Sequence, residues 1–182
     1  MRKALALGTV ALSLAGLAAA AAPASAADVT ATFTVAAGTL SIATAATSAN
    51  LGTATTSLTG TTVTGTLPKV TVTDNRGSTL GWNSSVASTA FTSGALTIAA
   101  SKAKAYIVPT NGPTLTSAAL SAVPSTTAID AATGLTLGAA QVFVTATTTA
   151  SNSVDYTPTV QVTIDSTVAA ATYSGTISHT VV

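Results

Sequence analysis

The fold is decided by the stretch Val70-Thr71-Val72-Thr73-Asp74-Asn75-Arg76-Gly77-Ser78-Thr79-Leu80-Gly81-Trp82. Apolar and hydroxyl side chains alternate over residues 70–73, which is the period of a β-strand with one buried face. Residues 74–77 then carry a tight-turn signal, with Asp early and Gly last. The next strand opens on Trp82, which should share a face with Ser84 and Val86. The stretch therefore predicts a strand, a turn and a second strand.

The same alternation recurs along the chain. It is found over residues 29–35 (VTATFTV), 142–147 (VFVTAT), 160–164 (VQVTI) and 173–181 (YSGTISHTV). In the last of these, Tyr173, Gly175, Ile177, His179 and Val181 should share the apolar face. β-Branched Val, Ile and Thr suit a pleated surface, and no helical stripe competes with them after the first 26 residues. Two alanine-rich runs, 43–46 and 118–122, are the helix candidates, and both are short.

These patterns predict an all-β fold with seven to nine short strands. We expect one antiparallel β-sandwich, immunoglobulin-like in its broad architecture, over residues 27–182. Residues 108–139 hold three prolines and alternate poorly, so they are predicted to be a long connection within that domain.

The N-terminus has the pattern of a secretory signal peptide. Arg2 and Lys3 precede an uncharged run over residues 4–22, and Ala24-Ser25-Ala26 closes it with small residues. A membrane anchor is the alternative, because a span needs about 20 apolar residues. The run is mostly Ala and Gly, however, and Pro23 with the small residues favours cleavage after Ala26. The remaining protein is then expected to be secreted, without membrane insertion.

Charge and composition limit the classes of ligand and chemistry that the protein can support. Without residues 1–26 the chain has four cationic side chains against five carboxylates, all Asp, a net charge of −1. Scattered cations cannot supply the phosphate contacts of nucleic-acid binding. The chain has no cysteine, so thiol catalysis and thiolate metal sites are excluded.

Candidate catalytic residues are few. His179 is the single histidine, and no G-x-S-x-G motif accompanies it. Its place on the apolar face favours a histidine at the core edge or an interface. No paired carboxylates or metal-ligand cluster stand out. We therefore expect no enzyme, metal or cofactor, with a secreted hydrolase as the weakest alternative.

Trp82 admits two interpretations. A lone tryptophan in a β-sandwich is most often part of the core. A partly exposed indole beside polar turn residues would instead stack on the C–H face of a sugar ring.

The turn stretch and the closing strand together resemble the WxL-type cell-wall-binding domain of Gram-positive bacterial surface proteins. Members of that family carry one tryptophan motif after a D-x-R-G turn and a second in a closing strand of the form Y-x-G-T-I-x-W-x-L. Here Trp82-Asn83-Ser84 lacks the leucine of the first motif, and His179-Thr180-Val181 stands where the second has Trp-x-Leu. Residues 38–42 and the Asn50-Leu51-Gly52 step also fit, so the resemblance covers most of residues 27–182.

The resemblance implies a surface protein that associates non-covalently with the cell wall, with peptidoglycan as the ligand. It points to Trp82 and His179 as binding residues. The supporting motif residues would be Asp74, Arg76, Gly77, Gly81, Tyr173 and Gly175. A histidine in place of the second tryptophan titrates near neutral pH, so weaker or pH-dependent binding is expected. The alternative from another class is a structural subunit that assembles with its own copies or with other surface proteins through exposed strand edges.

Overall fold

The computed structural model describes residues 29–182 apart from residues 79, 117–124 and 148–149. The predicted signal peptide, its cleavage site at Ala26 and the alanine-rich run at 118–122 lie outside the described residues. Contacts divide the chain into two units, Met1–Thr34 and Val35–Val182. Every described strand belongs to the second unit.

The regular structure of the described residues is nearly all β, as the alternation predicts. The strands are β1 (Leu40–Thr44), β2 (Thr61–Thr66), β3 (Val70–Asp74), β4 (Trp82–Ser88), β5 (Phe91–Ser93), β6 (Leu96–Ile98), β7 (Ala103–Tyr106), β8 (Thr114–Leu115), β9 (Leu135–Thr136), β10 (Gln141–Ala146), β11 (Asn152–Tyr156), β12 (Thr159–Ile164) and β13 (Ile177–Val181). Two 3-10 turns, η1 (Ala100–Lys102) and η2 (Pro109–Asn111), are the helical elements of the described part. Within it, no helix is long and apolar enough to cross a membrane. The predicted seven to nine strands were too few, because several strands have only two or three residues.

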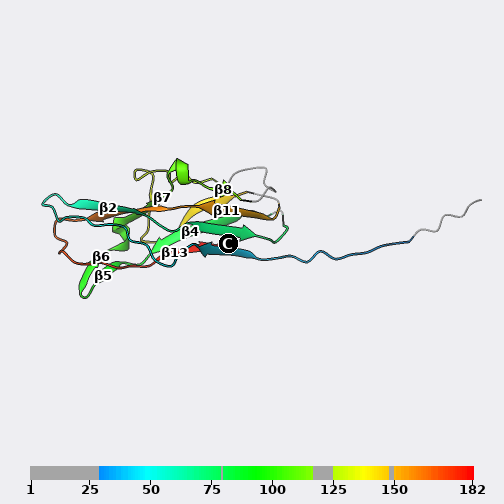
Figure 1. Cartoon of the computed structure of the whole chain (residues 1–182), viewed down its shortest axis with the longest axis horizontal. Coiled ribbons are helices and arrows are strands. Elements are labelled where there is room, and N and C mark those ends of the chain that lie inside the picture. Colours follow the sequence, from blue (N-terminus) through cyan, green and yellow to red (C-terminus); the bar gives the residue numbers. More distant parts are fainter. Residues whose placement is uncertain (1–28, 79, 117–124, 148–149) are drawn as a thin grey trace, which may run out of the picture. The chain divides into compact units, whose positions relative to one another are not determined.

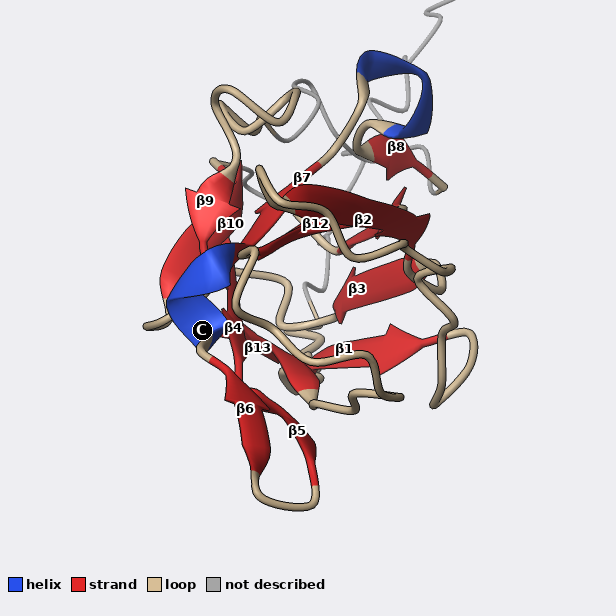
Figure 2. Ribbon diagram, turned by 90° about the vertical axis from the view of Figure 1, so that its left-hand side faces the viewer, coloured by secondary structure: helices blue, strands red, loops and turns tan. Residues whose placement is uncertain are grey.

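All strand pairs are antiparallel, and they form two packed layers. One layer joins the sheet β1-β3-β11-β8 to the sheet β2-β12-β7-β9 (Figure 1). The two sheets are linked because β2 leads into β3 and β11 leads into β12. At that bend, Leu67 N–H donates to the Pro158 carbonyl at 2.8 Å. The second layer is the sheet β10-β4-β13, and the β5–β6 hairpin projects away from the larger sheets (Figure 2).

The core lies between these layers and follows the predicted period of two. Val70 and Val72 in β3, and Val160 and Val162 in β12, are buried. Tyr156 of the first layer meets Phe143 of the second edge-to-face, with ring centroids 6.0 Å apart. The all-β sandwich prediction is thus confirmed, since each amphipathic strand buries one face against the other layer.

Two strand predictions need correction. Residues 29–35 form no strand, and Val29, Phe33 and Val35 are 89, 89 and 82% exposed. Alternation gives a segment one apolar and one polar face, but it does not show whether a neighbouring strand is available for backbone hydrogen bonds. In β10, a register shift between Val142 and Val144 leaves Val142 exposed and buries both Phe143 and Val144. Such a β-bulge turns consecutive side chains to one face, which simple alternation does not anticipate.

The long connection over residues 108–139 was predicted in outline only. It contains η2 and the two-residue strands β8 and β9, which pair with β11 and β7. The run at 43–46 is not helical: it covers the end of β1 and the residues after it.

Candidate functional site

The D-x-R-G turn is held by one ion pair with several hydrogen bonds. The Asp74 carboxylate accepts from Arg76 backbone N–H at 3.0 Å, from Nε at 2.9 Å and from Nη2 at 2.8 Å. Arg76 Nη2 also donates to the Gly81 carbonyl at 3.0 Å. These hydrogen bonds from Arg76 lower the pKa of the 3% exposed Asp74 carboxyl, and burial opposes them. The predicted turn is confirmed. The Arg76 side chain links Asp74 at the start of the 74–81 loop to Gly81 at its end.

The two glycines of this motif, Gly77 and Gly81, are favoured at their positions for different physical reasons. Gly77 has φ +62°, a left-handed conformation that favours glycine, with open space around it. A Cβ on Gly81 would lie 2.0 Å from the Ala146 carbonyl oxygen of β10. Gly81 therefore allows the loop to pack against the neighbouring strand.

Trp82 lies in the core, which is the first of the two interpretations. The residue is 2% exposed, and its Nε1–H donates to Asn152 Oδ1 at 3.1 Å. Stacking on a sugar would need an exposed ring face, and this indole has none to offer. Its role in this structure is to fix β4 against β11, so the platform interpretation is not supported by its position.

A shallow hollow lies over the same motif. It has a volume of about 590 Å³ and is bounded by the loop, by β10 and by the chain end. Its lining residues are Arg76, Leu80, Gly81, Trp82, Asn83, Thr145, Ala146, Thr147 and Val182. Leu80 is 67% exposed, so an apolar side chain stands in solvent among amide and hydroxyl groups.

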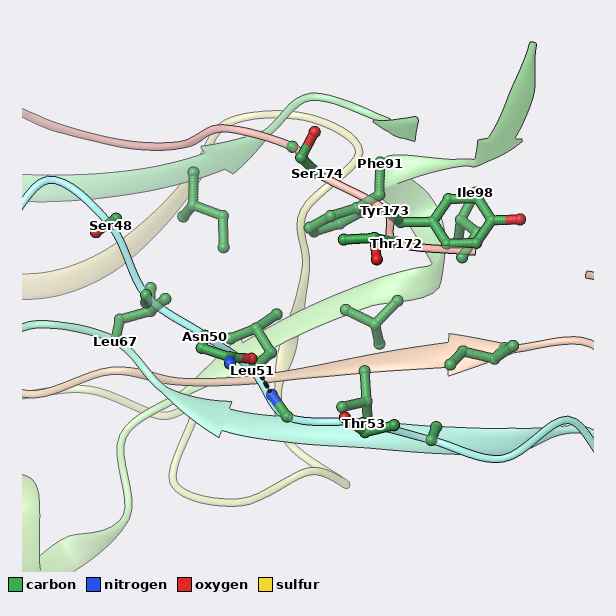
Figure 3. Close-up of a pocket in the computed structure, with 18 of the residues that line it drawn as sticks. Ser48, Asn50, Leu51, Thr53, Leu67, Phe91, Ile98, Thr172, Tyr173 and Ser174 are labelled. Atoms are coloured by element: carbon green, nitrogen blue, oxygen red, sulfur yellow. Dashed lines mark hydrogen bonds between the residues drawn. The ribbon is translucent and has the colours of Figure 1, made fainter. Parts of the chain in front are cut away.

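His179, Tyr173 and Gly175 lie elsewhere, on a groove of about 1070 Å³. One wall is the extended segment over residues 44–56, and the other is the segment over residues 168–177. In Figure 3, Asn50, Leu51 and Thr53 come from the first segment, whereas Thr172, Tyr173 and Ser174 come from the second. The floor includes apolar side chains of the first layer and of the β5–β6 hairpin: Val63, Leu67, Phe91, Ile98, Val162 and Ile164.

The groove carries no formal charge on its described lining. Its side chains are aliphatic, aromatic, hydroxyl or amide, with His179 as the titratable base and no Asp, Lys or Arg among them. Among the described residues, no group of three or more His, Cys, Asp or Glu could hold a metal ion. The arrangement suits binding of an uncharged, extended ligand.

His179 is partly buried and surrounded by aromatic rings. Its ring centroid is 6.5 Å from that of Phe143 and 6.4 Å from that of Tyr156. Its Nδ1 is buried and has no hydrogen-bond partner in the described structure. Burial lowers the pKa of His179 to about 4, so the imidazole is neutral at physiological pH. The expectation that it titrates near neutral pH was wrong, because the sequence does not reveal this desolvation.

The other two motif residues of the closing segment act on the backbone. The Tyr173 hydroxyl donates to the Ala169 carbonyl at 2.9 Å. A Cβ on Gly175 would lie 2.8 Å from Phe91 Cδ1 and 3.1 Å from the Ala90 carbonyl oxygen. Both residues thereby shape the groove wall rather than offering a reactive group to it.

The predicted site residues thus form two groups. Asp74, Arg76, Gly77, Gly81 and Trp82 gather at the turn, and Tyr173, Gly175 and His179 gather at the groove. The hollow and the groove share no lining residue.

Several important residues had no sequence signal. Asn152, the indole partner, sits in a polar run where Asn is ordinary in a turn. Ser84 and Tyr156 form a buried hydroxyl pair at 2.6 Å across the layers, and burial raises the pKa of Tyr156 to about 12. The groove wall over residues 45–56 looks like a linker in sequence, because its apolar residues follow no period.

No protein-family model matches this chain, and no curated protein is significantly similar to it. The resemblance to the WxL-type domain therefore remains a hypothesis drawn from the motif residues.

Proposed function

We propose that the chain is a secreted, non-catalytic structural protein of the bacterial cell surface, held non-covalently on the wall with peptidoglycan as its ligand. The observation that carries the proposal is the hollow beside the D-x-R-G turn. Three motif residues that resemble the wall-binding family, Arg76, Gly81 and Trp82, line this hollow, and the Arg76 side chain links Asp74 to Gly81 beside it.

The chemistry of the hollow suits a neutral glycan. Leu80 offers an apolar surface to the C–H face of a sugar, and Asn83 and Thr145 stand beside it with amide and hydroxyl groups. Small-ligand sites commonly combine an apolar surface with a few polar groups of this kind. Trp82 supports this surface from below by fixing the start of β4.

The surroundings of His179 support binding rather than catalysis. A general base needs a nucleophile within hydrogen-bond reach and a pKa near the working pH. The rings in contact with His179 are Phe143 and Tyr156, and its pKa of about 4 makes it a poor base.

The experiment is co-sedimentation of the secreted protein with washed Gram-positive cell walls, comparing Leu80→Asp with Leu58→Asp. Both leucines are exposed, at 67 and 98%, but only Leu80 lines the hollow. We expect Leu80→Asp to lose retention and Leu58→Asp to pellet like the wild type. A wild type that stays in the supernatant would overturn wall association, and equal retention of both variants would remove the hollow as its site.

A second candidate function is assembly of copies into a surface structure. The specific observation in its favour is the alternating segment over residues 29–35, in which Val29, Phe33 and Val35 are 82 to 89% exposed.

A further inference from the structure

The groove and the segment over residues 29–35 are complementary in chemistry. The groove has an apolar floor, uncharged walls and a volume of about 1070 Å³. The segment Val29-Thr30-Ala31-Thr32-Phe33-Thr34-Val35 is equally uncharged and has one apolar and one hydroxyl face. The apolar face of the segment could therefore cover the apolar floor of the groove.

Among the described residues, few backbone hydrogen bonds tie the groove wall over residues 45–56 to neighbouring strands. Residues 45–60 form no strand; Ala45 N–H bonds to the Lys69 carbonyl, and Gly52 N–H bonds to the Asn50 side chain. Across the groove, β13 pairs with β4 along one edge, and its other edge lies near β1 without a ladder between the two strands. An edge without ladder hydrogen bonds can serve as a template for an added strand.

The segment has the properties of a strand without a partner. Val29, Phe33 and Val35 are 82 to 89% exposed, and the residues between them are threonines or alanine. Large apolar side chains in a row are costly to leave in water and commonly mark an interaction surface. In strand addition, backbone hydrogen bonds supply affinity, and alternate side chains in pockets supply specificity.

We propose that residues 29–35 of one copy bind as an added strand in the groove of a second copy. Val29, Ala31, Phe33 and Val35 face the apolar floor, and the threonines face solvent. Because segment and groove are different surfaces, the contact is head-to-tail, and it builds open chains or closed rings of subunits. The inference rests on the proposed extracellular structural role, but it uses none of the residues of the hollow.

The first test is the mass of the secreted, purified protein by sedimentation velocity across a concentration series, without cell walls. The matched variants are Phe33→Asp and Thr32→Asp, neighbours on opposite faces of the same segment. We expect concentration-dependent oligomers for the wild type and Thr32→Asp, and monomer for Phe33→Asp. Both residues precede β1, so neither change affects the sandwich. A monomeric wild type at all concentrations, or equal behaviour of the two variants, would overturn the proposal.

The second test places the segment in the groove by disulfide formation, which the cysteine-free chain allows without background. One copy carries Phe33→Cys and a second, of different tag size, carries Thr172→Cys in the groove wall. The control partner carries Leu58→Cys, exposed but outside the groove lining. We expect mixed oxidation to give the Phe33–Thr172 heterodimer severalfold above the Phe33–Leu58 one. Equal yields would overturn the groove as the acceptor.

These outcomes are separable from those of the wall experiment. If Leu80→Asp loses wall retention but still forms oligomers, the hollow binds the wall and takes no part in assembly. Monomeric Phe33→Asp that still pellets with walls supports assembly through the segment and leaves wall retention in place.

Discussion

Trp82 of β4 and Asn152 of β11 join the two layers of the sandwich by a single buried hydrogen bond, from the indole Nε1–H to the amide Oδ1 at 3.1 Å. Both residues are 2% exposed. A polar atom buried this deeply costs free energy unless it is paired, so the indole requires its partner.

The first prediction uses this tryptophan, which is the only one in the chain. The folded protein should show blue-shifted fluorescence that added quencher barely reduces, because the indole is shielded from water. Replacing Trp82 by Phe should lower the free energy of unfolding by about 1–3 kcal/mol, since the buried hydrogen bond from the indole to Asn152 is lost. Urea denaturation followed by circular dichroism measures this loss. Strong quenching of the native protein would contradict the buried position.

The second prediction compares two ion pairs. Arg76→Ala removes the two guanidinium hydrogen bonds to the Asp74 carboxylate and keeps the backbone one, and we expect a clear loss in the free energy of unfolding. The matched control is Lys102→Ala, which breaks a pair to Asp165 with both side chains about half exposed. That change should cost about 0–1 kcal/mol. Equal losses in urea denaturation would show that the turn does not depend on its ion pair.

The third prediction concerns pH and His179. Its pKa is about 4 in the folded protein against an ordinary value of 6.5. As pH falls below 6.5, the unfolded chain takes up a proton that the folded protein refuses. Stability should therefore be fully present above pH 6.5 and fall by about 2–3 kcal/mol towards pH 4.

The check is thermal denaturation between pH 7.5 and 4.5 for the wild type and His179→Phe. The variant keeps a ring of similar size without the titration, so its stability should change little over this range. The carboxyl groups with lowered pKa values, Asp74, Asp130 and Asp155, lose their contributions at lower pH. Parallel pH curves for both proteins would rule out His179 as the cause.

The fourth prediction separates the two glycines of the turn motif. Gly81→Ala should unfold the protein or strongly destabilise it. The new Cβ would clash with the Ala146 carbonyl oxygen, which belongs to the backbone of β10 and cannot rotate away as a side chain could. Gly77→Ala introduces no clash, only a left-handed alanine, with a cost of about 1–2 kcal/mol. Melting temperatures of the two variants measure the difference, and a reversed order would contradict the packing at Gly81.

The parts that could be predicted from the sequence are those governed by local pattern. Val70 and Val72 are buried because strand side chains alternate, and Asp74 to Gly77 form the expected turn because Asp accepts local N–H groups and Gly takes φ > 0. The failures are non-local. The bulge at Phe143 depends on the register with β4, and the Asn152 partner of Trp82 is 70 residues away.

The groove was missed for the same reason. Leu51 and Tyr173 lie on its opposite walls although 122 positions separate them, and their nearest neighbours in sequence are small or polar residues. Leu51 belongs to no regular strand. The alternation over residues 173–181 predicted Tyr173 in a strand, but β13 begins at Ile177. The low pKa of His179 likewise arises from rings of β10 and β11 that only the folded chain brings to it.

The uncharged lining of the groove has a consequence for the environments in which the protein can work. Attraction between ions weakens as counter-ions accumulate, whereas burial of apolar surface is not screened and is strengthened by sulfate or phosphate. A link made in this groove would therefore not be weakened by added salt, and would loosen on cooling instead. Wherever the salt concentration varies, such a joint keeps its strength while a charged one weakens.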